Sequence, residues 1–265
     1  MIAVRKRLFI SAVALLILAG YALHTYARTL WVPAYQNLAG KRSVQQVLEQ
    51  YEAGSLERLR PYFDAAKAPY PPKRVALLAI KDEKKLELWT EEAGERFFIR
   101  SYPIKAASGV SGPKLREGDR QVPEGIYRLE HLNPNSAYHL SMKIDYPNSS
   151  DRQQAAQEGR TRLGGDIFIH GKAVSIGCLA MGDQAIEELF TLVARIGVHN
   201  VKVIIAPSDP RRGDIQHIAK HQPDWVAELY KNIAADMLLY NFMAANSGLT
   251  GRSSEGNGSL MKKCH

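Results

Sequence analysis

Residues 74–206 limit the possible fold more than any other part of the chain, because they form a series of short apolar or alternating runs separated by charged or Gly-rich turns. Runs of roughly four to eight residues with a period of two are typical of β-strands. The first runs follow one another so closely that they predict a β-meander. We expect strands at residues 75–80, 86–90, 97–99, 126–129, 138–144, 166–170 and 200–206, and a long loop over residues 108–125.

Helical patterns flank the predicted strands. Ser43 is a candidate N-cap for a helix that runs to about residue 59 and that Pro61 interrupts. After Cys178, the apolar positions of residues 185–193 share one helical face, and a last helix is expected over residues 225–242. The chain is therefore predicted to be an α+β protein, with a mostly β domain and flanking helices.

The N-terminal segment has the layout of an export signal. Arg5, Lys6 and Arg7 precede an apolar run over residues 8–23, which matches a basic n-region followed by an h-region. As a helix this run is about 24 Å long, which is long for a cleaved signal and short for a membrane span. We expect residues 1–31 to be a signal anchor in the inner membrane, with a cleaved signal peptide as the alternative. In both cases the rest of the chain would lie in the bacterial periplasm.

The net charge of +8 is compatible with three kinds of anionic surroundings: nucleic acid, lipid headgroups and a bacterial envelope. The sequence has no zinc-finger spacing and no RNA-recognition signature, and its basic residues are scattered. Nucleic acid is therefore not expected as a partner. General solubility remains the alternative explanation of the charge.

The chain has two cysteines, in very different settings. Cys264 belongs to a polar C-terminal tail and is expected to be a free thiol. Cys178 follows Gly177 in a Gly-rich segment that also contains His170 and Ser175. We therefore expect chemistry at Cys178 and none at Cys264.

The segment from His170 to Cys178 predicts a nucleophile and its base. A strand ends at His170, and the chain returns to Cys178 directly before a predicted helix, whose N–H groups would lower the pKa of the thiol. The imidazole could then accept the thiol proton. Gly177 would leave room for backbone N–H groups to face an oxyanion, and Ser175 would either hold the loop turn or donate to the pair.

These side chains have two alternative roles, as residues of the core or as zinc ligands. Cys178 could be a small buried apolar residue and His170 a histidine satisfied within the core. A zinc site could use His139, His170 and Cys178, or the pair His217 and His221. Neither set is accompanied by further ligands at the spacing that is typical of zinc sites. We therefore expect no metal and no cofactor.

The same segment resembles the active-site motif of the YkuD-type L,D-transpeptidases, and most of all the YafK-like branch. His170-Gly171 and Ser175-Ile176-Gly177-Cys178 match the motif. Two positions depart from it, because most members have His where Ile176 stands and Arg where Ala180 stands. Further matching segments are residues 112–114, 117–119, 122–127, 138–141 and 145–148, together with Asp151. The resemblance covers about residues 74–207.

This resemblance implies an enzyme that acts on peptidoglycan stem peptides. Cys178 would attack the L,D-peptide bond after diaminopimelate in a tetrapeptide stem and form an acyl-enzyme. An amine acceptor would give a cross-link in cell-wall remodelling, whereas water would make the enzyme a hydrolase that cleaves such bonds or releases bound lipoprotein. Gly171, His139 and Tyr127 are candidate substrate-lining residues.

The expected domain organisation follows from these segments. Residues 32–72 would be a helical segment with a Pro-rich linker, and residues 73–245 an L,D-transpeptidase-like catalytic domain with a C-terminal helix. Residues 246–265 would be a flexible Gly/Ser-rich tail. The sequence leaves open the acyl acceptor, the oligomeric state and the cleavage of the first segment.

Overall fold

The structure is a computed structural model that describes residues 2–241. Cys264, the predicted tail and the end of the predicted last helix at Phe242 lie outside the described residues. Within the described part the strands form one mixed sheet in the order β3-β2-β1-β8-β4-β5-β6-β7. The strands are β1 (Arg74–Ile80), β2 (Lys85–Glu92), β3 (Glu95–Pro103), β4 (Gly125–Asn133), β5 (Ser141–Ile144), β6 (Phe168–His170), β7 (Leu179–Ala180) and β8 (Val201–Ala206).

The predicted meander and the α+β class are confirmed. β1, β2 and β3 pair antiparallel in sequence order, and the predicted loop fills the chain between β3 and β4. β1 pairs in parallel with β8, and β6 with β7. The strand predicted over residues 138–144 begins only at Ser141, because His139 has a positive φ of 79° that takes the backbone out of the strand conformation.

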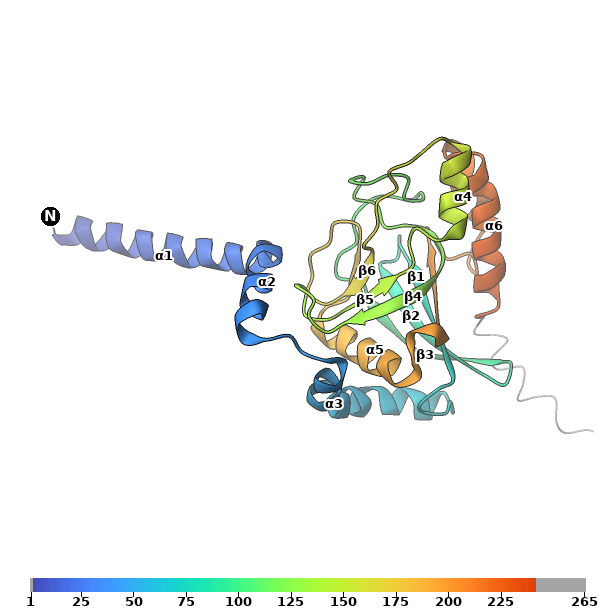
Figure 1. The fold of residues 1–265 in the computed structure, drawn as a ribbon, viewed down its shortest axis with the longest axis horizontal. Helices are drawn as coiled ribbons and strands as arrows, with labels where there is room; N and C mark the ends of the chain where they lie inside the picture. Colours follow the sequence, from blue (N-terminus) through green and yellow to red (C-terminus); the bar gives the residue numbers. More distant parts are fainter. Residues whose placement is uncertain (1, 242–265) are drawn as a thin grey trace, which may run out of the picture.

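Two hydrophobic cores lie on opposite faces of this sheet. Alternate residues of β1 point to different cores, with Leu77 in one and Leu78 in the other. The first core is covered by α3 (Val44–Ala65) and α5 (Asp183–Ile196), and the second by α6 (Trp225–Leu238). Figure 1 shows α3 and α5 together on one side of the sheet and α6 on the other side. β1 is thus buried on both faces.

The N-cap of α3 was predicted correctly, but the interruption at Pro61 was wrong. The Ser43 side chain and the Gln46 side chain form a reciprocal capping box at the start of the helix. The helix then continues through Pro61 to Ala65. Proline removes one backbone hydrogen bond, and we attribute the continuity to Leu59 and Phe63, which are fully buried on either side of it.

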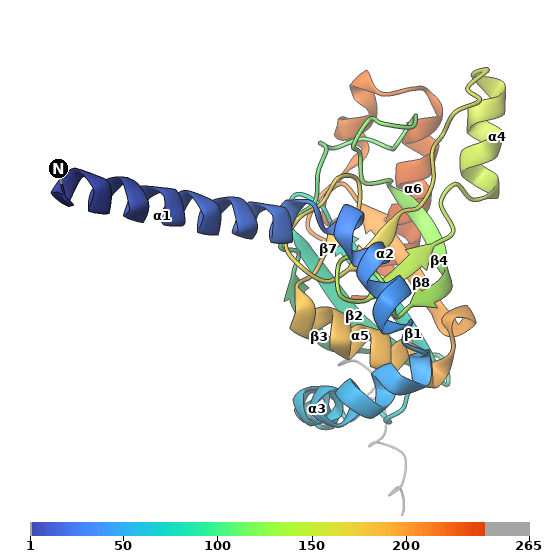
Figure 2. The ribbon, with the colours of Figure 1, turned by 60° about the vertical axis from the view of Figure 1, so that its left-hand side comes forward.

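Two helices precede this domain. α1 (Ile2–Tyr26) projects away from the body of the molecule, and α2 (Arg28–Ala39) turns sharply and lies against it (Figures 1 and 2). Over residues 2–241 no single helix is long and apolar enough to cross a membrane. Phe9–Leu23 and Arg28–Ala39 meet that requirement only as a pair, across a bend of 78°. The expected boundary between residues 31 and 32 falls inside α2.

The remaining elements are short. α4 (Ser149–Gln157), which the sequence pattern did not predict, starts with a capping box between Asn148 and Asp151. Two 3-10 helices complete the described part of the chain: η1 (Val198–Asn200) precedes β8, and η2 (Gln216–His221) lies between β8 and α6.

Candidate active site

The predicted base ends β6, and the predicted nucleophile directly precedes β7, the parallel neighbour of β6. His170 ends β6 and stands opposite Ala180 of β7. Cys178 directly precedes β7, and its Sγ accepts a hydrogen bond from the backbone N–H of Phe168 at 3.4 Å. Cys178 thus lies beside Phe168 at the start of β6, and His170 ends the same strand two residues further on.

The His170 ring is held in a defined orientation and tautomer. Its Nδ1 lies 2.6 Å from the carbonyl oxygen of Gly171. A carbonyl can only accept, so Nδ1 carries the proton and Nε2 keeps its lone pair. The ring stacks on Tyr138 at a centroid distance of 4.8 Å, and the residue is only 2% exposed. Burial lowers the pKa of His170, and the hydrogen bond to Gly171 opposes that shift.

The environment of Cys178 differs from the predicted one. The chain does not pass from Cys178 into a helix, since β7 intervenes and α5 starts only at Asp183. Burial raises the pKa of the Cys178 thiol, more than the hydrogen bond from Phe168 lowers it. The prediction of a helix N-terminus that lowers this pKa was therefore wrong. Among the hydrogen bonds of residues 2–241, none joins the His170 ring to Cys178 Sγ.

A tight turn presents Cys178. Ser175 Oγ accepts a hydrogen bond from the Cys178 N–H at 3.0 Å and donates to the Cys178 carbonyl at 2.6 Å. Of the two roles predicted for Ser175, the structure therefore has it holding the turn. Gly177 has a φ of 94°, where L side chains are strained, and its N–H donates to Ser108 Oγ at 2.6 Å. Both backbone N–H groups thus have acceptors here, and the oxyanion role of Gly177 stays a prediction.

Gly171 is required by close packing rather than by its backbone angle. A Cβ on Gly171 would lie 2.6 Å from the Tyr138 carbonyl oxygen and 2.8 Å from Asp183 Oδ1. The Gly171 N–H donates to the Leu140 carbonyl at 3.1 Å. Gly171 therefore lets the β6 end approach the segment that carries Tyr138.

The loop between β3 and β4 supports the Cys178 turn from outside the motif. Ser108 Oγ donates to the Arg120 carbonyl at 2.7 Å while it accepts from Gly177. Lys81 holds the two ends of this loop together. Its Nζ donates to the carbonyls of Val110, Gly112 and Val122. The same Nζ forms an ion pair with buried Glu124 at 2.8 Å. The nucleophile turn thus rests on a loop whose shape is fixed by a buried ion pair.

Two of the predicted lining residues have structural partners. His139 Nε2 lies 2.9 Å from Glu187 Oε1, and its ring packs edge-on against Tyr51. Tyr127 is 2% exposed, and its hydroxyl donates to the Glu124 carbonyl at 3.2 Å. Contact of substrate with Tyr127 is not supported by this position, because its ring belongs to the core.

Three residues near the site were missed as functional candidates. Tyr138 stacks on the His170 ring, and Ser108 accepts from Gly177. Lys114 is nearly buried and paired with Asp119, and its charge lowers the pKa of Cys178 against the effect of burial. Lys114 lies in a segment that carried the resemblance, whereas Ser108 lies in an irregular loop with no periodic signal.

In the described part of the chain, no group of three or more His, Cys, Asp or Glu side chains could hold a metal ion. A cavity of about 230 Å³ lies between β3 and α5 and is lined by Lys105, Asp183 and Glu188 among others. Neither Cys178 nor His170 lines it.

The structure thus brings a thiol in a hydrogen-bonded turn next to the strand that ends at a buried imidazole. Comparison with known proteins identifies the family of the chain. Residues 75–210 match the family model of the YkuD L,D-transpeptidase catalytic domain. The match covers about half of the chain, and the chain therefore belongs to the YkuD family, as its motifs predicted.

The chain is also similar to individual known proteins. The chain is 37% identical over 138 residues to YafK of Escherichia coli strain K12, whose name gives L,D-transpeptidase as a supposed activity. That match covers 50% of this chain and 54% of YafK, so the chain spans about half the length of this curated relative. Among solved structures, the helical cell shape determining protein Pgp2 from Campylobacter jejuni aligns with a TM-score of 0.44 and 23% identity, over 63% of this chain and 56% of that one.

Proposed function

We propose that the protein is an L,D-transpeptidase that acts on peptidoglycan tetrapeptide stems through an acyl-enzyme on Cys178. The observation that carries the proposal is that Cys178 Sγ is hydrogen-bonded to the strand that ends at His170, while the hydrogen bond from His170 Nδ1 to Gly171 leaves Nε2 of the neutral ring unprotonated. Family membership supports the stem peptide as the substrate.

The mechanism begins with two neutral groups. As the Cys178 sulfur attacks the carbonyl carbon of the L,D-peptide bond, its proton passes to His170 Nε2. The carbon–nitrogen bond then breaks, and His170 returns the proton to the leaving amine of D-alanine. A thioester remains on Cys178. The resting pair needs no stable thiolate, which fits the burial of both groups.

Resolution of the thioester decides the product. An acceptor amine gives a new peptide bond and restores the thiol, whereas water gives a carboxylic acid. Hydrolysis is a second candidate, because the two positions that depart from the family motif hold Ile176, which is 75% exposed, and Ala180, which is buried. Neither side chain can bind the carboxylate of an acceptor strand.

Mass spectrometry of tetrapeptide muropeptides incubated with the full chain tests both proposals. We expect a mass increase on the protein that maps to Cys178, followed by cross-linked dimers from transpeptidation. Tripeptide without dimers would identify a hydrolase with the same acyl-enzyme. Absence of any protein adduct and of any muropeptide change would contradict both.

For location, we propose the periplasm, with residues 8–23 as an inner-membrane anchor. A reporter protein fused after His265 should then be active only outside the cytoplasm. A cytoplasmic signal would overturn the proposed location without bearing on the chemistry at Cys178.

A further inference from the structure

One face of α2 is fastened to the catalytic domain. Arg28 Nε donates to the carbonyl oxygen of Ala137 at 2.6 Å, and Gln36 Nε2 donates to the carbonyl oxygen of Asn135 at 2.8 Å. Val32, halfway between them, is 6% exposed. Residues four apart lie on the same side of a helix, so this face of α2 rests on the loop after β4.

The other face of α2 is apolar and faces away from the domain. Leu30 is 77% exposed and Leu38 is 90% exposed, whereas Tyr35, 61% exposed, lies nearer the fastened face because it follows Val32 by three residues. Leu30 and Leu38 are two turns apart, with Ala34 between them on the same stripe. Exposed Leu side chains that share one helix face mark an interaction surface.

The neighbouring helix indicates what covers this surface. α1 joins α2 through Ala27 alone and bears many exposed apolar side chains, among them Phe9, Leu15 and Leu18. Basic residues stand before this apolar stretch. In Figure 1, α2 lies between the domain and α1, and α1 runs away from the domain. A bilayer that held α1 would therefore lie against the outer face of α2.

Length and angle agree with a bilayer as the occupant. The apolar run of α1 is about 24 Å long, whereas a hydrocarbon core is about 30 Å thick. A short span is helped by apolar and aromatic groups at the interface. The bend of 78° between the two helices sets α2 nearly parallel to the membrane plane when α1 stands upright. Interfacial helices lie in this way, with the apolar face toward the acyl chains.

We propose that α2 is an interfacial helix whose Leu30, Ala34 and Leu38 face lies on a phospholipid bilayer, while its opposite face holds the catalytic domain. This inference rests on the proposed membrane anchoring by α1. It goes beyond the anchor, because it assigns a second lipid-binding surface and fixes which side of the domain faces the membrane.

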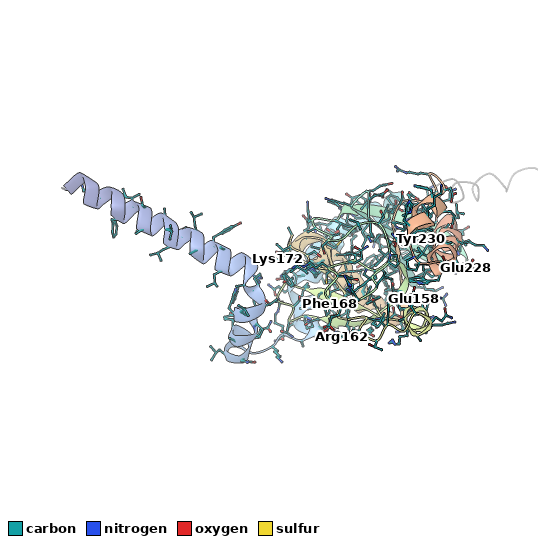
Figure 3. All side chains as sticks on the ribbon, turned by 90° about the horizontal axis from the view of Figure 1, so that it is seen from above. Glu158, Arg162, Phe168, Lys172, Glu228 and Tyr230 are labelled. Atoms are coloured by element: carbon teal, nitrogen blue, oxygen red, sulfur yellow. The ribbon has the colours of Figure 1, made fainter. Side chains whose placement is uncertain are left out.

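Site-directed spin labelling of the full chain tests the proposal. Single cysteines at Leu38→Cys, Leu18→Cys and Glu228→Cys would be placed in a Cys178→Ser, Cys264→Ser background. The protein would be reconstituted in vesicles of phosphatidylethanolamine and phosphatidylglycerol. Glu228 is the water control, since Figure 3 shows it on the far side of the domain from α1. Power saturation compares the access of oxygen, which partitions into lipid, with that of a water-soluble nickel chelate.

We expect labels at positions 38 and 18 to favour oxygen and the label at position 228 to favour the nickel chelate. If position 18 favours oxygen while position 38 behaves like position 228, the anchor stands and the α2 surface is wrong. If positions 18 and 38 both favour the nickel chelate, the anchor and the α2 surface both fail. Shielding of position 38 from both reagents would show that protein covers it, and would also overturn the proposal.

Discussion

Burial acts on both reacting groups at the residue scale, because it raises the pKa of the Cys178 thiol and lowers the pKa of the His170 imidazole. Both shifts favour the neutral form. In the proposed mechanism the resting state is therefore a thiol and an imidazole rather than a thiolate and an imidazolium, and the proton would move only as the sulfur attacks.

Substitution of the nucleophile is the most direct prediction at this scale. Cys178→Ala should abolish muropeptide turnover, because no other thiol lies in the motif. Cys264→Ala serves as the matched control and should keep the wild-type rate. Turnover by folded Cys178→Ala protein at the wild-type rate would contradict the cysteine mechanism.

The pH dependence of the site is a second prediction. The lowered pKa of His170 means that its neutral form persists as the pH falls, so the acidic limb of kcat/KM should lie below the ordinary titration range of histidine. In the free protein, alkylation of Cys178 by iodoacetamide should titrate above the range of an exposed thiol, since burial raises its pKa.

The proposed base can be tested by the rate of acylation together with the melting temperature. His170→Asn should slow acylation by about 10²–10⁴-fold, the usual loss for a general base. A variant that only loses packing would instead show a lower melting temperature and an unchanged rate for the folded fraction. That second outcome would leave His139 as the next histidine to test.

At the scale of elements, the Cys178 turn depends on a loop that is distant in sequence. Ser108→Ala removes the acceptor of the Gly177 N–H. A lost hydrogen bond of about 0.5–1.5 kcal/mol predicts a fall in kcat of roughly 3- to 10-fold. Ser101→Ala, on an exposed part of β3, is the control and should leave kcat unchanged. Equal kcat values for the two variants would show that the loop does not position the nucleophile.

The elements also show why the sequence predicts some features and misses others. β1 was predicted from a continuous apolar run of strand length, and α5 from apolar residues that repeat with a helical period. β7 is only two residues long and gives no period, so Cys178 was wrongly placed at the start of a helix. The pair of Cys178 and His170 was found from its spacing and its motif. Tyr138 and Ser108 were missed because their contacts depend on tertiary structure.

At the scale of the whole molecule, buried Glu188 joins three elements, α5, α3 and β3. It binds Arg58 of α3 at 2.7 Å, Arg100 of β3 at 2.8 Å and the Tyr102 hydroxyl at 2.9 Å. Glu188→Gln removes the charge while it keeps the shape. It should lower the free energy of unfolding by about 2 kcal/mol or more, as expected for hydrogen bonds to a buried charge.

Chemical denaturation with a matched exposed pair checks this prediction. Arg60 and Asp64 form an ion pair on α3, with side chains 57% and 61% exposed. Asp64→Asn should change the free energy of unfolding by less than about 0.5 kcal/mol. If Glu188→Gln were as mild as Asp64→Asn, the Glu188 cluster would not hold the layers together.

The bonds from α2 to the loop after β4 also govern how far an anchored enzyme could reach. A flexible Gly-rich tether with the 12 residues of α2 would let the catalytic domain wander by about 20 Å. The helix is instead bonded to the catalytic domain through Arg28 and Gln36, and it would hold the domain at a fixed position relative to the anchor. Cys178 would then stay at a constant distance from the bilayer surface and would meet new stem peptides by lateral diffusion of the whole protein. A Gly/Ser insertion between α2 and α3 would leave the catalytic domain fixed to α2. Loss of the Arg28 and Gln36 hydrogen bonds would instead let the domain move relative to the anchor.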